Sequence, residues 1–224
     1  MAAGEAVEVL GSPPRFVGRG GEKLDAALDR FAVDARGRRV IDAGASTGGF
    51  TDCLLQRGAR EVVAVDVGHG QLDARLRRDA RVTVMERTNV RRLDATRAGG
   101  EAELLCADLS FISLRTVAGA LVGLVVPGGD LLVLVKPQFE AGRVEASRGG
   151  GVIRDPAVWR RVLEEVRDAF LDKDAVMLDV MVSPLEGAQG NVEFLAHLRR
   201  GAVASAGVPD LDAVVAEASA RQER

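Results

Sequence analysis

The sequence predicts a doubly wound α/β domain, that is, a mostly parallel sheet with helices on both faces. Short apolar segments typical of strands alternate with segments of helical periodicity along most of the chain. The most apolar strand segment, 130–137, falls late in this alternation, as expected for a strand in the middle of a parallel sheet. A chain of 224 residues with 47% apolar residues is also long enough to form one domain with a sizeable core.

The first two thirds of the chain supply five expected strands and four expected helices. The helix expected at 20–33 places Leu24, Ala27, Leu28 and Phe31 at helical spacing, and the next helix ends at Gly58. In order, we expect a helix at 20–33, a strand at 38–44, a helix at 47–58, a strand at 61–68, a helix at 71–79, strands at 82–87 and 102–110, a helix at 113–125 that ends before Pro127-Gly128-Gly129, and a strand at 130–137.

The last third adds one helix and two strands with no helix between them. Asp155-Pro156 is typical of an N-cap followed by proline at the first helical position, and the helix extends to Leu171. The strands expected at 175–183 and 191–199 are separated by a loop rich in proline, glycine and asparagine. Because neighbouring strands without a crossover helix pair antiparallel, we expect a seven-stranded sheet with an antiparallel hairpin at its edge.

Composition excludes several classes of protein. The chain has two cysteines, Cys53 and Cys106, and two histidines, all isolated, so we expect neither a disulfide framework nor a metal site. The first residues lack the pattern of a signal peptide, and the longest apolar run, 117–127, is too short to span a bilayer. We therefore expect a cytoplasmic protein that does not bind membranes, with a monomer as the default.

Charge leaves the question of a nucleic-acid partner open. The net charge of −3 argues mildly against one, but basic residues gather in two stretches. These stretches are either ordinary solvated surface or faces that contact RNA. Their members are Arg15, Arg19, Lys23, Arg30, Arg36, Arg38 and Arg39 in the first, and Arg75, Arg77, Arg78, Arg81, Arg87, Arg91 and Arg92 in the second.

A glycine-rich turn at 42–50, DAGASTGGF, follows the first strand and precedes a helix. Glycine allows the backbone to approach a ligand closely, and a helix N-terminus offers free N–H groups. The spacing matches neither the dinucleotide fingerprint nor a P-loop. Asp66 ends the next strand, where a carboxylate can accept hydrogen bonds from both hydroxyls of a ribose.

This pairing of an early Asp-x-Gly turn with an acid at the next strand end is typical of S-adenosylmethionine-dependent methyltransferases. Asp108 ends the fourth strand on the same rim, and Asn89, just after the third strand, is within reach of an adenine there. The alternative is a generic tight turn in another nucleotide-binding sheet.

Four charged residues form a candidate catalytic set: Lys23, Asp108, Lys136 and Glu193. Each has an ordinary structural explanation when taken alone, such as a lysine that extends to the rim of the sheet. Together they suit proton removal from a hydroxyl, because burial and a second cation lower the pKa of a lysine towards neutrality. Lys136 would be the general base, Lys23 the second cation, and the two acids would orient the amines.

Eight sequence words resemble the FtsJ-type ribose methyltransferases, and most closely their TlyA (hemolysin A) branch. The resemblance covers residues 8–199, and the words occur in the family's order. They are RGGEKL at 19–24, DAGASTGGFTDCLLQRGA at 42–59, VDVGHGQL at 65–72, ERTNVR at 86–91, ADLSFISL at 107–114, LVKPQFE at 134–140, VIRDP at 152–156 and SPLEGAQGNVEF at 183–194.

The resemblance implies a class I methyltransferase fold and S-adenosyl-L-methionine-dependent 2′-O-methylation of ribose in ribosomal RNA, at cytidines of both subunits in the TlyA branch. It places the catalytic set on Lys23, Asp108, Lys136 and Glu193, and puts Gln138, Phe139 and Glu140 near the target nucleotide. Its implied cofactor contacts are Asp42, Gly44, Ser46, Thr47, Gly48, Gly49, Phe50, Asp66, Val67, Asn89 and Asp108.

The domain organisation departs from the family in places. TlyA proteins carry an N-terminal RNA-binding domain, of which residues 1–17, with a strand at 4–11, would be a remnant or linker. Either the chain is a shortened form of a longer protein, or this branch lacks the domain. Residues 18–200 would form the FtsJ-like domain, and 201–224 a tail that is disordered or holds a short helix at 211–222. Gly18 stands where the family has serine.

Two other functions remain open at this point. A small-molecule O-methyltransferase would share the cofactor turn without needing a basic rim. A non-enzymatic module that binds ribosomes would keep the fold without the chemistry. The target nucleotide cannot be predicted from the sequence, because RNA is selected largely by its shape.

Overall fold

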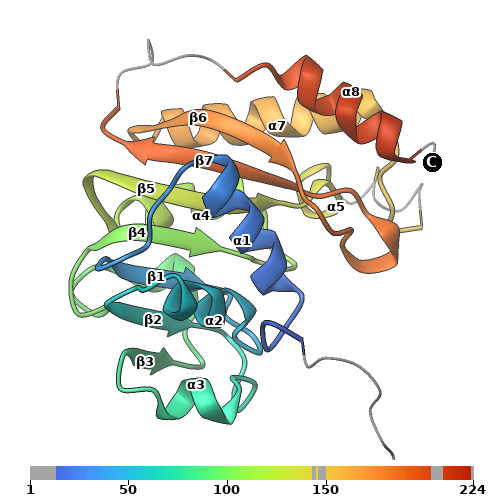
Figure 1. Ribbon diagram of the computed structural model, residues 1–224. Helices are drawn as coiled ribbons and strands as arrows, with labels where there is room; N and C mark the ends of the chain where they lie inside the picture. Colours follow the sequence, from blue (N-terminus) through green and yellow to red (C-terminus); the bar gives the residue numbers. More distant parts are fainter. Residues whose placement is uncertain (1–13, 143–144, 146–149, 203–208, 223–224) are drawn as a thin grey trace, which may run out of the picture.

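A seven-stranded sheet in the order β3-β2-β1-β4-β5-β7-β6 forms the centre of the computed structural model, which describes residues 14–142, 145, 150–202 and 209–222 (Figure 1). β1 to β5 are mutually parallel, whereas β7 is antiparallel to both β5 and β6. The predicted mostly parallel sheet with an antiparallel edge hairpin is therefore confirmed. The strands are β1 (Arg39–Ala43), β2 (Glu61–Val65), β3 (Val82–Met85), β4 (Ala102–Ala107), β5 (Val125–Val135), β6 (Ala175–Val182) and β7 (Phe194–Arg200).

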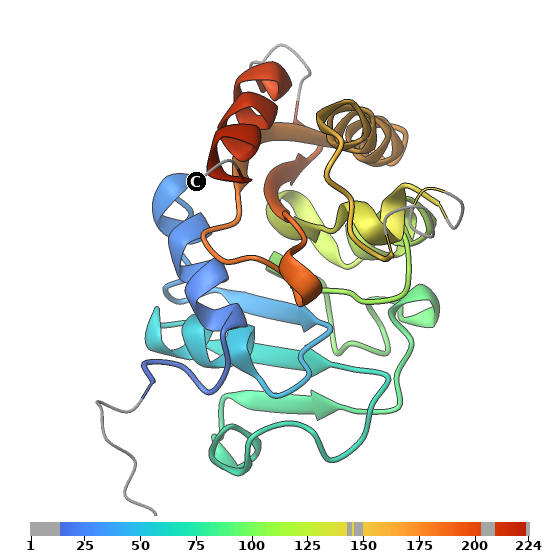
Figure 2. The ribbon, with the colours of Figure 1, turned by 90° about the vertical axis from the view of Figure 1, so that its right-hand side faces the viewer.

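Helices cover both faces of this sheet. Figure 2 shows α1 and α2 on one side and α7 on the other, and two separate apolar clusters fill the two layers between them. The helices are α1 (Gly20–Arg30), α2 (Gly49–Gln56), α3 (Ala74–Arg78), α4 (Leu114–Val122), α5 (Pro137–Glu140), α7 (Pro156–Leu171) and α8 (Leu211–Gln222), with short 3₁₀ turns η1 (Val90–Arg92) and η2 (Ala188–Gly190). α8, in the tail, packs against α7 and β6.

The largest difference from the prediction lies at the boundary between α4 and β5. The helix expected at 113–125 ends at Val122, and β5 begins at Val125 rather than at Asp130. The Pro127-Gly128-Gly129 segment therefore lies inside the strand, where the pairing of β4 with β5 changes register. A side chain at Gly129 would come within 2.6 Å of Val125, so glycine allows this irregularity.

Other differences are smaller. α3 starts only at Ala74, because the side chain of Asp73 accepts the N–H of Arg75 as an N-cap, and α1 ends at Arg30. α5 was not predicted at all. The strand expected at 4–11 lies outside the described residues. Within the described part of the chain, no helix is long and apolar enough to cross a membrane.

Candidate active site

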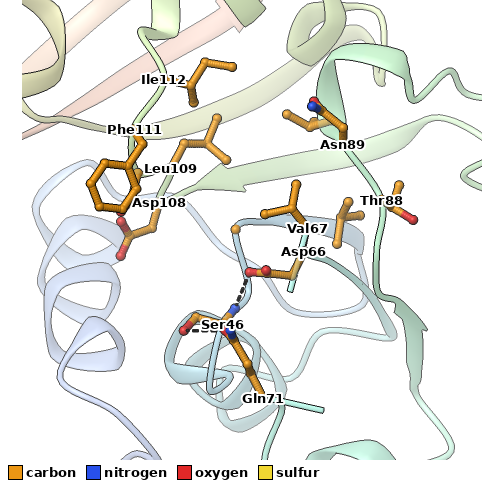
Figure 3. A pocket seen from close by; sticks show the side chains of 14 residues that line it. Ser46, Asp66, Val67, Gln71, Thr88, Asn89, Asp108, Leu109, Phe111 and Ile112 are labelled. Atoms are coloured by element: carbon orange, nitrogen blue, oxygen red, sulfur yellow. Dashed lines mark hydrogen bonds between the residues drawn. The ribbon is translucent and has the colours of Figure 1, made fainter. Parts of the chain in front are cut away.

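A pocket of about 420 Å³ opens at the carboxyl ends of the parallel strands (Figure 3). This is the edge at which open α/β sheets bind ligands, and the volume is in the range of small-molecule sites. The loops after β1, β2, β3 and β4 line it. The lining residues are Gly44, Ser46, Val65, Asp66, Val67, Gln71, Thr88, Asn89, Val90, Asp108, Leu109, Ser110, Phe111 and Ile112.

Asp66 is held in place by two backbone donors. Its carboxylate accepts the N–H of Ser46 at 2.8 Å and the N–H of Gly68 at 2.6 Å, and Figure 3 shows the first of these bonds. Each oxygen keeps lone-pair capacity for a further donor. The loops after β1 and β2 thus present a fixed carboxylate to the pocket.

Gly44 has no room for a side chain. It adopts a φ of +89°, and a Cβ there would lie 2.3 Å from the carbonyl oxygen of Asp108. The close approach of the β1 and β4 ends follows from their pairing, which matches Ala43 with Ala107. Glycine is therefore required for the two strand ends to meet at the pocket.

A second, smaller pocket of about 140 Å³ adjoins the first and shares Gly44, Ser46 and Asp108 with it. The remaining lining comes from the start of α1 and the start of α2. These residues are Gly18, Arg19, Gly20, Ala45, Thr47, Gly49 and Phe50. Most of the expected cofactor contacts thus lie on one continuous rim.

Two of the expected contacts, Asp42 and Gly48, line neither pocket. Asp42 is fully buried in β1 and accepts a 2.6 Å hydrogen bond from Thr51 of α2. Burial raises the pKa of Asp42 to about 7, although the bond from Thr51 acts in the opposite direction. Gly48, with a φ of +101°, packs against Leu76, whose Cδ1 would lie 2.3 Å from a Cβ there. Both residues therefore contact the packed side of the turn and do not face the pockets.

Two lysine–carboxylate pairs stand beside the pockets. Lys136 Nζ lies 2.5 Å from Asp108 Oδ1 and donates a 3.1 Å bond to Ser110 Oγ. Lys23 Nζ lies 2.5 Å from Glu193 Oε2. The four residues of the predicted catalytic set therefore form two ion pairs.

Sheet register brings these pairs to one rim. Val135, the last residue of β5, pairs with Phe194, the first residue of β7, so Lys136 and Glu193 flank the same end of this strand pair. Asp108 directly follows β4, which is the other neighbour of β5. The start of α1 also approaches this rim. A Cβ at Gly20, three residues before Lys23, would lie 3.8 Å from Asp108 Oδ2.

Several lining residues were missed by sequence reasoning. They are Gln71 and Thr88 in the loops after β2 and β3, and the run Leu109, Ser110, Phe111 and Ile112 after β4. Phe111 is 91% exposed and adopts a φ of +62°. Its ring centroid lies 5.2 Å from that of Phe139, with the two rings tilted. Its position just past a strand end was the available signal, since such residues face the ligand edge.

Glu140, which the resemblance placed near the target nucleotide, lines neither pocket. It is 2% exposed, and its carboxylate binds the first residues of α4. Phe139 does face the rim, with its ring 5.9 Å from Lys136 Nζ. In the described residues, no three His, Cys, Asp or Glu side chains gather to hold a metal ion.

The sheet order, the pocket at its carboxyl edge and the acid after β2 define a class I, S-adenosylmethionine-type methyltransferase fold. Solved structures agree: an S-adenosylmethionine-dependent methyltransferase from Mesorhizobium loti superimposes with a TM-score of 0.57 at 17% identity, over 78% of this chain and 96% of that one. A candidate hemolysin from Lactococcus lactis superimposes with a TM-score of 0.85 at 39% identity, over 92% of this chain and 99% of that one.

Family comparison is more specific. The model of the FtsJ-like methyltransferases matches residues 16–200, and the chain belongs to this family. It is 49% identical over 191 residues to the 16S/23S rRNA (cytidine-2′-O)-methyltransferase TlyA of Mycobacterium tuberculosis, covering 85% of this chain and 71% of the relative. The family resemblance predicted from the sequence words is confirmed, and the chain is an enzyme of the methyltransferase class.

Proposed function

We propose that this enzyme methylates the 2′-hydroxyl of a cytidine ribose in ribosomal RNA, with Lys136 as the general base. The observation that carries the proposal is the Lys136–Asp108 pair at the edge of the larger pocket, where a titratable amine meets a fixed carboxylate. The name of the Mycobacterium tuberculosis relative supplies the acceptor, cytidine in ribosomal RNA.

S-adenosyl-L-methionine fits the two adjoining pockets by the chemistry of their lining. The carboxylate of Asp66 suits ribose hydroxyls, and Asn89, with the apolar Val67 and Ile112, suits an adenine. The smaller pocket would take the amino-acid part of the cofactor, next to Asp108 and the start of α2. When bound, this cofactor supplies a methyl group on a sulfonium as the electrophile.

The choice of lysine in this chain favours a proton-transfer role. Lysine occurs only three times in the sequence, at 23, 136 and 173, while the other 27 of the 30 basic residues are arginine. Arginine stays protonated in proteins, whereas lysine can lose its proton when its surroundings favour the neutral amine. Lys136, the proposed base, is one of these three lysines.

The partners of Lys136 define how it would act. Asp108 and Ser110 fix the amine at the pocket edge, and in its neutral form, after its own proton has passed to solvent, it can accept the proton that leaves the ribose hydroxyl during attack. Lys23, neutralised by Glu193, would hold α1 against β7. Alignment and proton removal are thus the protein's main contributions.

We further place the reaction on ribosomal subunits in the cytoplasm, with the chain acting as a monomer. Residues 18–200 would be the catalytic domain, and 1–17 a remnant or linker of an RNA-binding domain. The family match at residues 16–200 supports the bounds of the catalytic domain, and the relative's name, which specifies both 16S and 23S rRNA, supports ribosomal RNA as the substrate.

The test is transfer of tritium from labelled S-adenosylmethionine to purified small and large ribosomal subunits. We expect label in 2′-O-methylcytidine after digestion of the RNA to nucleosides, and its loss in Lys136→Ala. Lys173→Ala is the matched control, because Lys173 is exposed and lies away from the pockets.

Two results would contradict the proposal. Label that resists ribonuclease and stays with small molecules would indicate a small-molecule acceptor. Ribosome binding with no cofactor binding would indicate a non-enzymatic module.

A further inference from the structure

The carboxylate of Glu140 is buried at the start of a different helix from its own. Glu140 ends α5, yet its Oε2 accepts the hydroxyl of Ser113 at 2.5 Å and its Oε1 accepts the N–H of Leu114 at 2.7 Å. These are donors at the N-terminus of α4, which α4 cannot satisfy by itself. Burial raises the pKa of Glu140, although both of these bonds act in the opposite direction.

The two segments joined by Glu140 carry the site. Residues 108–112, which connect β4 to α4, all line the larger pocket. On the other side, α5 directly follows Lys136, the proposed base. Glu140 therefore fixes the far end of the pocket loop to the helix that starts at the base.

Two further contacts join the same two segments. Lys136 binds Asp108 and Ser110. The ring centroids of Phe139 and Phe111 lie 5.2 Å apart, with the rings tilted by 48°. Of these contacts, those of Glu140 are the most deeply buried: its side chain is 2% exposed, and its bond from the Leu114 N–H is buried. The exposed ring contact and the partly exposed ion pair depend on a fixed spacing between the segments, and the buried carboxylate can set that spacing.

We propose that Glu140 is a positioning residue for the methyl-transfer reaction: by capping α4 it holds loop 108–112 at the distance from α5 that Lys136 needs to meet Asp108. This inference rests on the proposed function for the reaction that it serves. Glu140 touches neither pocket, so its effect is transmitted through the loop.

The hydrogen-bond pattern explains why an amide is not an adequate substitute. Ser113 Oγ already accepts from the backbone N–H and from Nε of Arg115, so its own hydrogen must point to an acceptor on Glu140. In Glu140→Gln, either the Ser113 hydroxyl or the Leu114 N–H would face an NH₂ group. The variant keeps the volume of the side chain, breaks one of these two bonds and removes the negative charge that lies 3.5 Å from Arg115 Nε.

A matched control is available at Glu165. Its carboxylate binds Nη1 of Arg115, the arginine that also donates from Nη2 to the backbone oxygen of Glu140. Glu165 lies on α7, and its described hydrogen bonds and ion pairs go to Arg115 and Arg161, not to loop 108–112. Glu165→Gln therefore disturbs the same arginine and the same helix α4 without releasing the loop.

The experiment compares the wild-type chain, Glu140→Gln and Glu165→Gln in three measurements: thermal unfolding, kcat and KM for the cofactor with ribosomal subunits, and hydrogen exchange of the peptides that cover 108–116. We expect kcat to fall about tenfold in Glu140→Gln while KM changes less than about threefold, because alignment is lost but most pocket contacts remain. Exchange of residues 109–114 should become faster, and Glu165→Gln should resemble the wild type.

Unchanged kcat in a folded Glu140→Gln variant, or an equal loss in Glu165→Gln, would overturn the inference. If Glu140→Gln does not fold, Ser113→Ala, which removes one of the two bonds, takes its place under the same criteria. A wild-type chain that methylates no ribosomal RNA would sink the proposed function alone. Loop exchange and cofactor affinity would then decide the role of Glu140, and unchanged values of both would reject it.

Discussion

The two lysine–carboxylate pairs have the same N–O distance, 2.5 Å, but different surroundings. In the Lys23–Glu193 pair the side chains are 9% and 3% exposed, whereas in the Lys136–Asp108 pair they are 11% and 26% exposed. Gly187 covers the first pair so closely that a Cβ there would lie 2.1 Å from Glu193 Oε1. Asp108 instead borders both pockets.

This difference in burial suggests different roles for the two pairs, structural support for Lys23–Glu193 and proton transfer for Lys136–Asp108. A buried pair cannot exchange its partners without leaving a buried charge, so Lys23–Glu193 is suited to hold α1 against β7. A pair that borders a pocket can release its lysine when another group approaches the carboxylate. The burial of the carboxylate, more than the distance within the pair, therefore favours Lys136 over Lys23 as the proposed base.

The largest expected effect follows from replacing Lys136 by arginine. Lys136→Arg keeps the positive charge and the pair with Asp108 but removes a group that can lose its proton, so kcat should fall about 10²–10⁴-fold, the usual contribution of general-base catalysis. Cofactor affinity, measured by calorimetry, should stay within about threefold of the wild type. Activity retained in Lys136→Arg would mean that the charge of Lys136 matters and its proton does not.

The next effect concerns stability and compares the two pairs directly. Lys23→Met leaves Glu193 buried without a cation and should lower the free energy of unfolding by about 3–5 kcal/mol. Lys136→Met leaves a partly exposed Asp108 and should cost about 1 kcal/mol. Urea unfolding of both variants measures the difference, and equal losses would show that burial does not distinguish the pairs.

A third carboxylate extends the comparison, because Asp42 is fully buried and forms no ion pair within the described residues. Its pKa is raised to about 7, so the folded state holds a proton that the unfolded state releases above its ordinary pKa. Stability from this group is present at low pH and is lost as pH rises from about 4 to about 7.

Relative to Asp42→Asn, the wild-type chain should therefore lose about 2 kcal/mol of unfolding free energy between pH 5 and pH 7. Urea unfolding at several pH values gives both curves. Parallel curves for the two proteins would show that Asp42 is ionised throughout this range.

Much of the fold could be predicted because its signals are local. Alternating apolar segments, the Asp155-Pro156 cap and the missing crossover before β7 each lie within a few residues. The start of β5 was misplaced because a glycine inside a strand looks the same in sequence as a glycine that ends a helix. Only the neighbouring strand, through its register shift, decides between them.

The residues of the site also fall into those that local sequence indicates and those that only tertiary contacts reveal. Sequence words indicated the four charged residues, and the structure brings them together in pairs. Glu140 occurs in one of these words, yet its partners are 26 and 27 residues away in the chain, and no local pattern indicates that it caps α4. Phe111 and Gln71 were missed because the path of a loop, unlike a strand, follows from tertiary contacts.

The lining of the pockets has a further consequence for how such an enzyme can change. All the residues that border the two pockets lie between 18 and 112, whereas Lys136 directly follows β5 and Glu193 directly precedes β7. The half of the sheet that lines the proposed site of the methyl donor is thus distinct from the half that carries the proposed base. Descendants of one ancestor could alter the acceptor by remodelling the second half, while the donor site in the first half stays the same.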